Sequence, residues 1–226
     1  MKQSIIITGA SGNMGAAVAE RLMSEGYHII GTVHSESSAN ALNEKGIEAK
    51  PLDLTNEEAV SQFVNELDKD ITGAVLTVGG FAVGGFEDTD GTAVKKMYTL
   101  NFETAYFMVR PLLKVFEKRG GGQIILVGSR PALNPEEGKN LISYALSKRL
   151  VFYLAELINA YGKDKNIQAT VLVPGIIDTP RNRQDMPDAD YSKWVSLDAI
   201  ADSVRFIFSD AGKQMKEGVI KLYNRS

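Results

Sequence analysis

The sequence predicts a single α/β domain in which a doubly wound, mostly parallel sheet of about seven strands carries helices on both faces. Three observations lead to this fold class. Short apolar, β-branched runs alternate with longer segments of helical periodicity from one end of the chain to the other. The first of these runs are apolar throughout rather than alternating, as in strands that are covered on both faces. No linker, repeat or low-complexity tract divides the 226 residues.

The expected strands follow the apolar runs in chain order: Ser4–Thr8, His28–Val33, Glu48–Leu52, Gly73–Val78, Gln123–Gly128, Gln168–Val173 and Val219–Leu222. The helical periodicity predicts helices near residues 13–25, 36–45, 56–69, 90–118, 142–161 and 197–209. Alternation of this kind implies right-handed crossovers between parallel strands. Ligands of such sheets bind beyond the carboxyl ends of the strands, so a site is expected in the segments that follow the strands.

Composition excludes several kinds of chemistry. The chain has no cysteine, so disulfides, thiolate nucleophiles and thiolate metal sites are excluded, and its two histidines, His28 and His34, are too few for a histidine-rich metal site. A formal net charge of −3 gives no electrostatic reason to expect a nucleic-acid partner. The N-terminal apolar run is too short for a signal peptide, and no apolar stretch approaches the roughly 18 residues of a membrane span. We therefore expect a cytoplasmic protein without a metal, nucleic-acid or membrane partner.

A glycine-rich turn, Thr8-Gly9-Ala10-Ser11-Gly12-Asn13-Met14-Gly15, follows the first strand and leads into an alanine-rich helix. Gly9 permits the tight turn, Gly12 permits close approach of the backbone to a pyrophosphate, and Gly15 permits helix and strand to pack together. The free N–H groups and the positive dipole end of the helix then face the phosphates. The turn is expected to bind a dinucleotide, with contacts from Thr8, Gly9, Ser11, Gly12, Asn13, Met14 and Gly15.

Tyr144 and Lys148 begin the helix expected at 142–161, and their spacing of four places both side chains on one helical face. A free tyrosine titrates near pH 10, which makes it a poor acid–base group at neutral pH. A nearby ammonium favours phenolate and is expected to lower the pKa of Tyr144. Lysine is a flexible donor that can serve both the phenol and a ribose hydroxyl. The two residues are therefore candidates for proton transfer.

The glycine turn and the Tyr-x-x-x-Lys pair resemble the motifs of the short-chain dehydrogenase/reductase family, and the resemblance spans nearly the whole chain. Ser129, 15 residues before Tyr144, matches the family's catalytic serine, which would donate to the substrate oxygen. Asn101 matches its helix-distorting asparagine, which would free a backbone carbonyl to hold a relay water. The resemblance implies one Rossmann-type domain, residues 1–226, carrying both cofactor and substrate sites. It implies an NAD(P)(H)-dependent oxidoreductase that moves hydride at a carbonyl or alcohol carbon, with Tyr144 as general acid/base.

Further cofactor contacts follow from the same resemblance. Val33 stands where NAD-using relatives carry an acid that reads the ribose, and His34 stands where NADP-using relatives often carry arginine. NADP(H) is therefore favoured over NAD(H). The other expected contacts are Asp53 and Leu54 at the adenine, Gly79 and Gly80 at the adenosine, and Tyr144, Lys148, Pro174, Gly175, Ile177 and Thr179 around the nicotinamide.

The sequence leaves an alternative for both the function and the substrate class. A non-catalytic, NADP(H)-binding redox-sensing regulator on the same fold is the other candidate, although such regulators generally lose the tyrosine or lysine that this chain keeps. The sequence does not name the small-molecule substrate, but the doubled Gly-Gly pattern of residues 79–85 resembles the corresponding loop of dihydropteridine reductases. The polar segment 181–194 is expected to form a lid over the substrate, with Arg181, Arg183 and Trp194 as solvated loop residues.

An oligomer is expected from the helices that carry Asn101 and Tyr144. Both predicted helices are apolar on more than one face, as in residues 105–108 and 151–154. A helix that is apolar beyond one stripe needs a second partner, and closed symmetric assembly is the usual solution. The family resemblance implies the same. We therefore expect a homotetramer or a homodimer.

Overall fold

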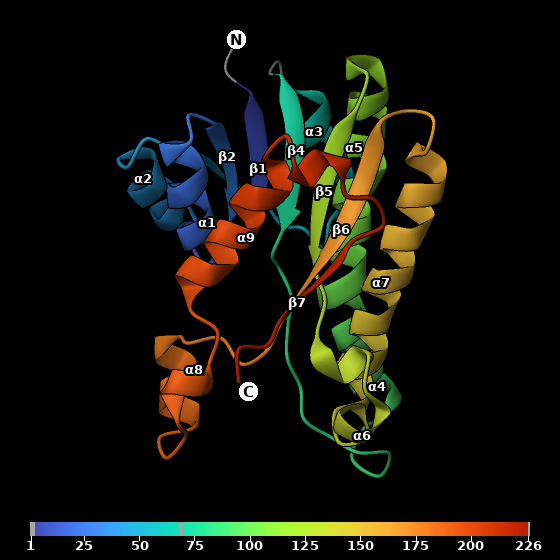
Figure 1. Cartoon of the computed structure of the whole chain (residues 1–226). Helices are drawn as coiled ribbons and strands as arrows, with labels where there is room; N and C mark the ends of the chain where they lie inside the picture. The colour runs from blue at the N-terminus through green and yellow to red at the C-terminus, as the bar shows by residue number, and fades with distance from the viewer. Residues whose placement is uncertain (1–2, 68–69, 226) are drawn as a thin grey trace.

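A computed structural model describes residues 3–67 and 70–225 of the chain. Within those residues seven strands form one sheet in the order β3-β2-β1-β4-β5-β6-β7, and each neighbouring pair is parallel (Figure 1). The strands are β1 Ser4–Thr8, β2 His28–Val33, β3 Glu48–Pro51, β4 Ile71–Leu76, β5 Gly122–Val127, β6 Ile167–Pro174 and β7 Val219–Leu222. The chain winds outward from β1 to β3 and then in the other direction from β4 to β7, so the predicted doubly wound sheet is confirmed.

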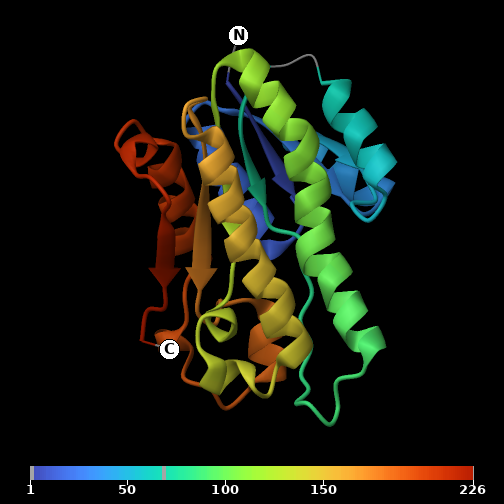
Figure 2. The same cartoon turned by 90° about the vertical axis from the view of Figure 1, so that its right-hand side faces the viewer.

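Helices connect the strands and cover both faces of the sheet (Figure 2). They are α1 Asn13–Ser24, α2 Glu36–Asn43, α3 Glu57–Asn65, α4 Gly91–Tyr98, α5 Thr104–Arg119, α6 Pro135–Gly138, α7 Ile142–Gly162, α8 Pro180–Asp185 and α9 Leu197–Phe208. Short 3-10 turns lie at Arg130–Ala132, Tyr191–Lys193 and Gly212–Gln214. A π-helical turn, Thr99–Glu103, lies between α4 and α5.

Two apolar cores lie on opposite faces of the sheet. Helices α1, α2 and α9 pack on one face, and α3, α5 and α7 pack on the other. Successive side chains of a strand point to opposite faces, so Ile5 and Ile7 of β1 enter the first core while Ile6 enters the second. All three are fully buried. The continuous apolar runs of the central strands follow from this double coverage.

The structure departs from the sequence-based prediction mainly at the helix expected over 90–118. The π-helical turn divides it into α4 and α5. Strand ends differ from the predicted ones by two residues at most, as at β4, which spans 71–76 rather than 73–78, because ladder hydrogen bonds rather than apolarity define them. The short helices α6 and α8 were not predicted. Residues 68–69, the predicted end of the third helix, lie outside the described residues.

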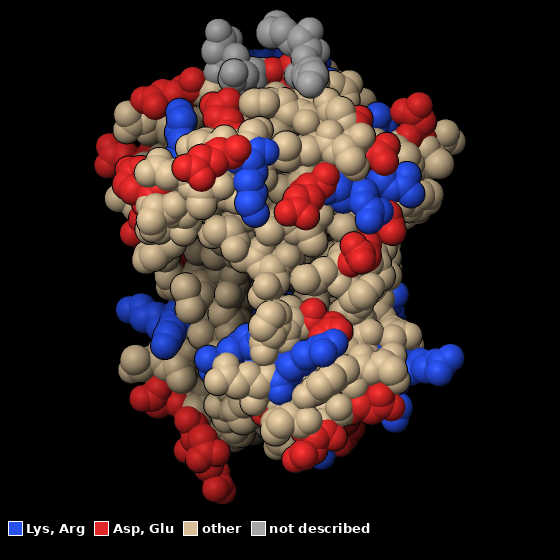
Figure 3. Space-filling view, turned by 90° about the vertical axis from the view of Figure 1, so that its left-hand side faces the viewer, with Lys and Arg blue, Asp and Glu red and all other residues tan. Residues whose placement is uncertain are grey.

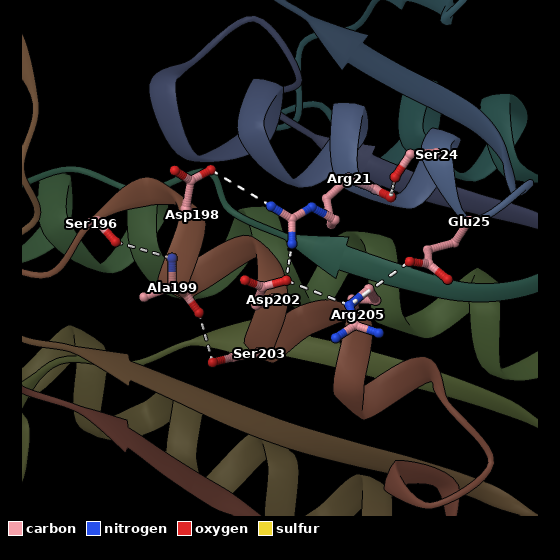
Figure 4. A network of polar contacts seen from close by, with 9 residues as sticks. All are labelled: Arg21, Ser24, Glu25, Ser196, Asp198, Ala199, Asp202, Ser203 and Arg205. Carbon is pink, nitrogen blue, oxygen red and sulfur yellow. Dashed lines mark hydrogen bonds and ion pairs between the residues drawn. The ribbon is translucent and has the colours of Figure 1, made fainter.

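Charged side chains connect α1 and α9, which are far apart in the sequence (Figure 4). Arg21 of α1 pairs with Asp202 and lies 3.7 Å from Asp198, both on α9. Arg205 of α9 lies 3.9 Å from Glu25, which follows α1. These side chains are partly exposed, so each pair contributes about 1 kcal/mol or less. The contacts join the helix after the glycine turn to the last helix of the chain.

The surface over α1 and α9 mixes basic and acidic side chains and is hollowed at mid-height, above the level of α8 (Figure 3). The two signs of charge are interspersed on this face rather than gathered into one patch. No helix in the described part of the chain is long and apolar enough to cross a membrane.

Candidate active site

A cleft opens at the carboxyl edge of the sheet, where the glycine turn after β1 faces the segment after β4 and the winding direction reverses. Its volume of about 580 Å³ suits a small-molecule ligand. The sequence-predicted residues that line it are Gly9, Ser11, Gly12, Asn13, Met14, Gly15, Val33, His34, Asp53, Leu54 and Gly79. Thr32, Leu52, Thr55, Thr77, Val78, Leu100 and Thr104 also line it, and sequence reasoning did not single them out.

The glycine turn packs too tightly for side chains at two of its positions. Gly9 has φ = 65°, a conformation that favours glycine, and a Cβ on Gly15 would lie 2.3 Å from the Gly9 carbonyl oxygen. A Cβ on Gly12 would lie 3.3 Å from the same oxygen. Gly12 caps α1 without a side-chain hydrogen bond, and the first turn of α1 carries no acidic side chain. An uncapped helix N-terminus at the floor of a cleft suits a phosphate group.

The strand ends beside the turn shape the ribose side of the cleft. Val33 is buried at the end of β2, whereas His34 is exposed. Asp53 is exposed, and its Oδ1 accepts hydrogen bonds from the Thr55 N–H at 2.9 Å and the Thr55 hydroxyl at 2.7 Å. These bonds are the main reason that the pKa of Asp53 lies below its usual value. The buried Thr8 contributes no side chain to the cleft, because its Oγ1 accepts from the Thr77 N–H at 3.0 Å.

Asn101 lies in the π-helical turn and fastens the loop after β4. Its Oδ1 accepts from the Gly80 N–H at 2.9 Å, and its Nδ2 lies 3.1 Å from the Gly80 carbonyl oxygen and 3.0 Å from the Ser147 hydroxyl. A Cβ on Gly79 would lie 2.5 Å from Asn101 Oδ1 and 3.2 Å from Lys148 Nζ. The expected helix distortion is present as the π turn. The expected cause needs correction, because the amide bonds to the backbone of the neighbouring loop and not to the backbone of its own helix, where its partner is the Met97 sulfur at 3.8 Å.

Lys148 is buried, with 5% of its surface exposed, and its Nζ donates to the Val127 carbonyl oxygen at 2.8 Å. Burial disfavours the charged form and lowers the pKa of Lys148 to about 8. Its ammonium thus lies at the end of β5, within reach of Gly79 and Asn101. The structure brings four predicted side chains to this corner from three segments: Asn101 from the π turn, Ser129 from the end of β5, and Tyr144 and Lys148 from α7. None of the four lines the cleft, which meets this corner at Gly79.

Burial also raises the pKa of Tyr144 above its usual value, and the nearby Ser129 hydroxyl lowers it by less. The expectation that Lys148 would lower this pKa is wrong for the chain alone, because desolvation dominates and the ammonium bonds to Val127. The Ser129 hydroxyl is buried and has no hydrogen-bond partner among the described residues. The Ser129 hydroxyl is near enough to the Tyr144 phenol to lower its pKa, but the two groups do not form a hydrogen bond of regular geometry.

The segment after β6 does not line the cleft, although four of its residues were predicted to contact a cofactor. The Gly175 N–H, next to Pro174, donates to a carbonyl of β7. Ile177 pairs with Val195 in an isolated bridge, and the Thr179 hydroxyl caps α8 by accepting from the Asn182 N–H at 3.2 Å. Gly80, fastened by Asn101, also lies outside the cleft lining.

The segment expected as a lid is ordered by its own side chains. Arg183 forms a bidentate pair with Asp178, at 2.6 and 2.8 Å, and stands over the Tyr191 ring. Arg181 pairs with Asp185 at 2.8 Å. Trp194 is buried, so its expected place as a solvated loop residue is wrong. Its ring lies 4.7 Å from that of Tyr191, and this packing explains the burial.

Phe81 contacts the candidate catalytic tyrosine, and sequence reasoning missed it. Its ring centroid lies 5.0 Å from that of Tyr144, edge to face at 72°. The available signal was an aromatic residue just after the Gly79-Gly80 turn, in a segment at the ligand edge of the sheet. No group of three or more potential metal ligands occurs in the part of the chain that the structure describes.

Comparison with known proteins gives this site a family. The profile of the short chain dehydrogenase family matches residues 3–190, most of the chain. The chain belongs to this family. It is therefore an NAD(P)-dependent dehydrogenase/reductase with a Rossmann-type domain.

Individual relatives of this dehydrogenase are distant but cover nearly its full length. It is 25% identical to the uncharacterized oxidoreductase YmfI of Bacillus subtilis, over 93% of each chain. It is 26% identical to a dihydropteridine reductase of Dictyostelium discoideum, over 90% of this chain and 87% of the relative. Among solved structures it resembles ElxO with NADP bound, with a TM-score of 0.90, 23% identity, and coverage of 98% of this chain and 97% of ElxO.

Proposed function

We propose that the enzyme transfers hydride between NADP(H) and a carbonyl or alcohol carbon of a small molecule, with Tyr144 as the general acid/base. The unpartnered Ser129 hydroxyl carries this proposal. A buried hydroxyl without a partner is costly unless a ligand satisfies it, and this one lies beside the Tyr144 phenol. These two hydroxyls lie next to each other outside the lining of the cleft, and a substrate oxygen placed between them would accept from both.

The chain's residues have separable roles in this reaction. NADPH supplies the hydride when it is bound. The Ser129 hydroxyl donates to the substrate oxygen and stabilises the charge that develops there. The phenol of Tyr144 gives its proton to the same oxygen. Burial raises the pKa of this phenol, so the phenol is protonated at neutral pH and can donate to a carbonyl oxygen.

Lys148 and Asn101 support these two groups. The Lys148 ammonium, with a pKa of about 8, is mostly charged at neutral pH and supplies a positive charge one helical turn from the phenol. Asn101 holds Gly80 and so fixes the loop between β4 and α4. Gly79 keeps Asn101 and Lys148 close, because a side chain at this position would displace both.

The geometry of the cleft suits a nicotinamide dinucleotide. The tight glycine turn and the uncapped N-terminus of α1 suit the pyrophosphate, and the cleft continues past His34 and Asp53 on its ribose side. No carboxylate stands at Val33 to repel a 2′-phosphate. Next to His34, at the start of α2, the Ser35 hydroxyl lies 3.0 Å from the hydroxyls of both Ser37 and Ser38. These features support NADP(H) over NAD(H).

The decisive experiment measures NADPH oxidation by the purified protein against aldehydes, ketones, quinones and pterins. We expect turnover with at least one class, and loss of that turnover in Ser129→Ala, which keeps the fold and removes the unpartnered hydroxyl. NADPH binding without turnover of any class would overturn the proposal and favour a redox-sensing regulator. A Ser129→Ala variant with wild-type rates would remove the observation on which the proposal rests.

We also propose a homo-oligomer built on α4, α5 and α7. The exposed apolar residues of these helices are Val94, Tyr98, Tyr106, Leu146, Leu150, Tyr153, Leu157 and Tyr161. Exposed apolar side chains that recur along neighbouring helices are typical of an interface between subunits. Light scattering at micromolar protein should give a dimer or tetramer, and a charged substitution such as Tyr153→Glu should dissociate it. A monomeric wild-type protein would contradict this.

A further inference from the structure

The loop between β4 and α4 places an exposed aromatic ring directly on the proposed proton donor. The loop descends below the sheet to lie beside α6 and the start of α7 (Figure 1). Phe81 is 63% exposed, yet its ring is in edge-to-face contact with Tyr144 at 5.0 Å. An apolar ring of this size that remains exposed at a reaction centre has a face available for another ring.

Backbone hydrogen bonds fix the loop against the helix that carries Tyr144. The Gly84 N–H donates to the Asn140 carbonyl oxygen, and the Ile142 N–H donates to the Gly84 carbonyl oxygen, both at 2.9 Å. A Cβ on Gly84 would lie 2.8 Å from the Thr89 hydroxyl oxygen, so the loop is closely packed at this point. At its other end Asn101 holds Gly80. Phe81 is thus attached on both sides to the catalytic corner.

Three arginines in the segments after β5 and β6 are paired with carboxylates. Arg130, next to Ser129, donates to Glu137 at 2.7 Å. Arg181 and Arg183, in the segment after β6, pair with Asp185 and Asp178. A substrate carboxylate or phosphate would have to displace one of these carboxylates, whereas an uncharged ring meets an apolar surface at Phe81. Val83, 76% exposed, extends that surface along the loop.

We infer that the enzyme acts on uncharged carbonyl compounds whose reacting carbon is attached to a flat, conjugated ring, and that Phe81 selects them by stacking. This inference rests on the proposed function, because the ring must lie on Phe81 while its carbonyl oxygen meets Tyr144 and Ser129. A saturated ring has no flat face, so it loses the stacking contact and keeps only apolar burial. Phe81 is therefore a specificity-determining residue.

The test compares benzaldehyde with cyclohexanecarbaldehyde, which present the same reacting group on a flat and on a puckered six-membered ring. For each variant the ratio of the two kcat/KM values with NADPH is measured, so that intrinsic reactivity cancels between variants. Phe81→Leu should lower the wild-type ratio about 3- to 10-fold, the contribution of one aromatic contact. Phe81→Tyr keeps the ring and should keep the ratio. The matched control Phe86→Leu, in the same loop without a ring contact to Tyr144, should also keep it.

Charge is tested with 4-formylbenzoate and its neutral methyl ester, and the ester should have the higher kcat/KM. A Phe81→Leu ratio within twofold of wild type, a wild-type enzyme that reduces only the saturated aldehyde, or a preference for the anion would each overturn the inference and leave the proposed function standing. Absence of NADPH oxidation with every carbonyl class would instead overturn the proposed function. Circular dichroism of Phe81→Leu establishes that the variant is folded, as expected for an exposed position.

Discussion

The glycine turn in the cleft and the catalytic corner beside it are built on different principles. At the glycine turn the groups that face the ligand are backbone atoms, and the shape depends on the absence of side chains at Gly9 and Gly15. At the catalytic corner the groups are side chains from three segments, and several of them are buried without a partner of opposite charge or a hydrogen-bond partner. Lys148 is a buried ammonium, Tyr144 is a phenol shifted away from ionisation, and Ser129 is a buried hydroxyl without a partner.

The difference shows where the molecule gives up stability for function. A backbone cradle costs little in the free protein, since its N–H groups face solvent until a phosphate arrives. A buried charge and an unpaired hydroxyl both disfavour the folded state. Substitutions at the catalytic corner should therefore separate activity from stability, whereas substitutions in the glycine turn should damage packing or cofactor binding.

Tyr144→Phe should have the largest effect on activity, and it should separate catalysis at the corner from cofactor binding at the glycine turn. The variant loses only the phenolic oxygen, so kcat should fall roughly 100- to 10,000-fold, the usual contribution of a positioned acid, while the NADPH dissociation constant stays within about twofold. Steady-state kinetics and fluorescence titration measure the two quantities. Retention of more than about a tenth of the rate would mean that Tyr144 is not the acid, since less than roughly 1.4 kcal/mol of barrier would then be involved.

Lys148→Met tests how much the buried Lys148 ammonium lowers the free energy of unfolding, because this effect depends on pH. Because the pKa of Lys148 is about 8 in the folded protein and 10.5 in an exposed lysine, the unfolded chain binds more protons between these values. The free energy of unfolding of the wild type should therefore rise relative to Lys148→Met as pH increases from 8 to about 10.5, by up to roughly 3 kcal/mol. Below pH 8 the penalty is complete and the difference is constant.

Urea denaturation of both proteins at several pH values measures this difference, and the effects of titrating groups remote from Lys148 cancel between the two. Exposed Lys216→Met is the matched control and should show no such slope. A difference between wild type and Lys148→Met that does not change above pH 8 would show that the ammonium is not desolvated. Lys148→Met should also lose activity, since the positive charge beside Tyr144 is gone.

Gly15→Ala and Gly12→Ala distinguish packing from ligand contact within the turn. A Cβ at position 15 meets fixed backbone at 2.3 Å, so Gly15→Ala should lower the free energy of unfolding by about 1–3 kcal/mol. At position 12 the nearest atom is 3.3 Å away, so Gly12→Ala should change stability by less than about 1 kcal/mol and mainly weaken NADPH binding. Thermal melts and fluorescence titration measure the two effects. Equal destabilisation by both substitutions would refute the distinction.

His34→Asp gives the smallest expected effect and should leave the catalytic corner untouched. His34 is exposed at the ribose side of the cleft, whereas Val33 is buried and would accept a carboxylate poorly. A carboxylate at position 34 would repel a 2′-phosphate and weaken NADPH binding about tenfold, with NADH binding nearly unchanged. His34→Arg should strengthen NADPH binding instead. Equal changes in NADPH and NADH affinity would contradict NADP(H) preference.

The sequence was sufficient where the relevant information is local. The glycine turn and the Tyr144–Lys148 pair are short patterns whose geometry follows from one turn and one helix. The fold class followed from strand–helix alternation over the whole chain. Periodicity over 90–118 indicated one helix, because a π turn inserts only a single extra residue, and the distortion at Thr99–Glu103 was expected only from the family match of Asn101.

The features that were missed or misjudged depend on contacts between distant segments. The amide of Asn101 bonds to Gly80 rather than to the backbone of its own helix, and only the tertiary fold brings the two together. The sign of the Tyr144 pKa shift was wrong because spacing places Lys148 nearby but says nothing of burial. Phe81 was likewise an ordinary loop residue until the loop was seen fixed to α7.

The pairing of α1 with α9 has a consequence for how the chain is made. α1 is complete once the first residues are synthesised, but its neighbour α9, with Asp202 and Arg205, lies close to the C-terminus (Figure 4). Contacts of such long sequence separation form late, after much loop entropy has been lost. During synthesis, the side of α1 that contacts α9 therefore stays uncovered until nearly the whole chain has left the ribosome. The helices on this face of the sheet are complete only when α9, the last helix, has been made.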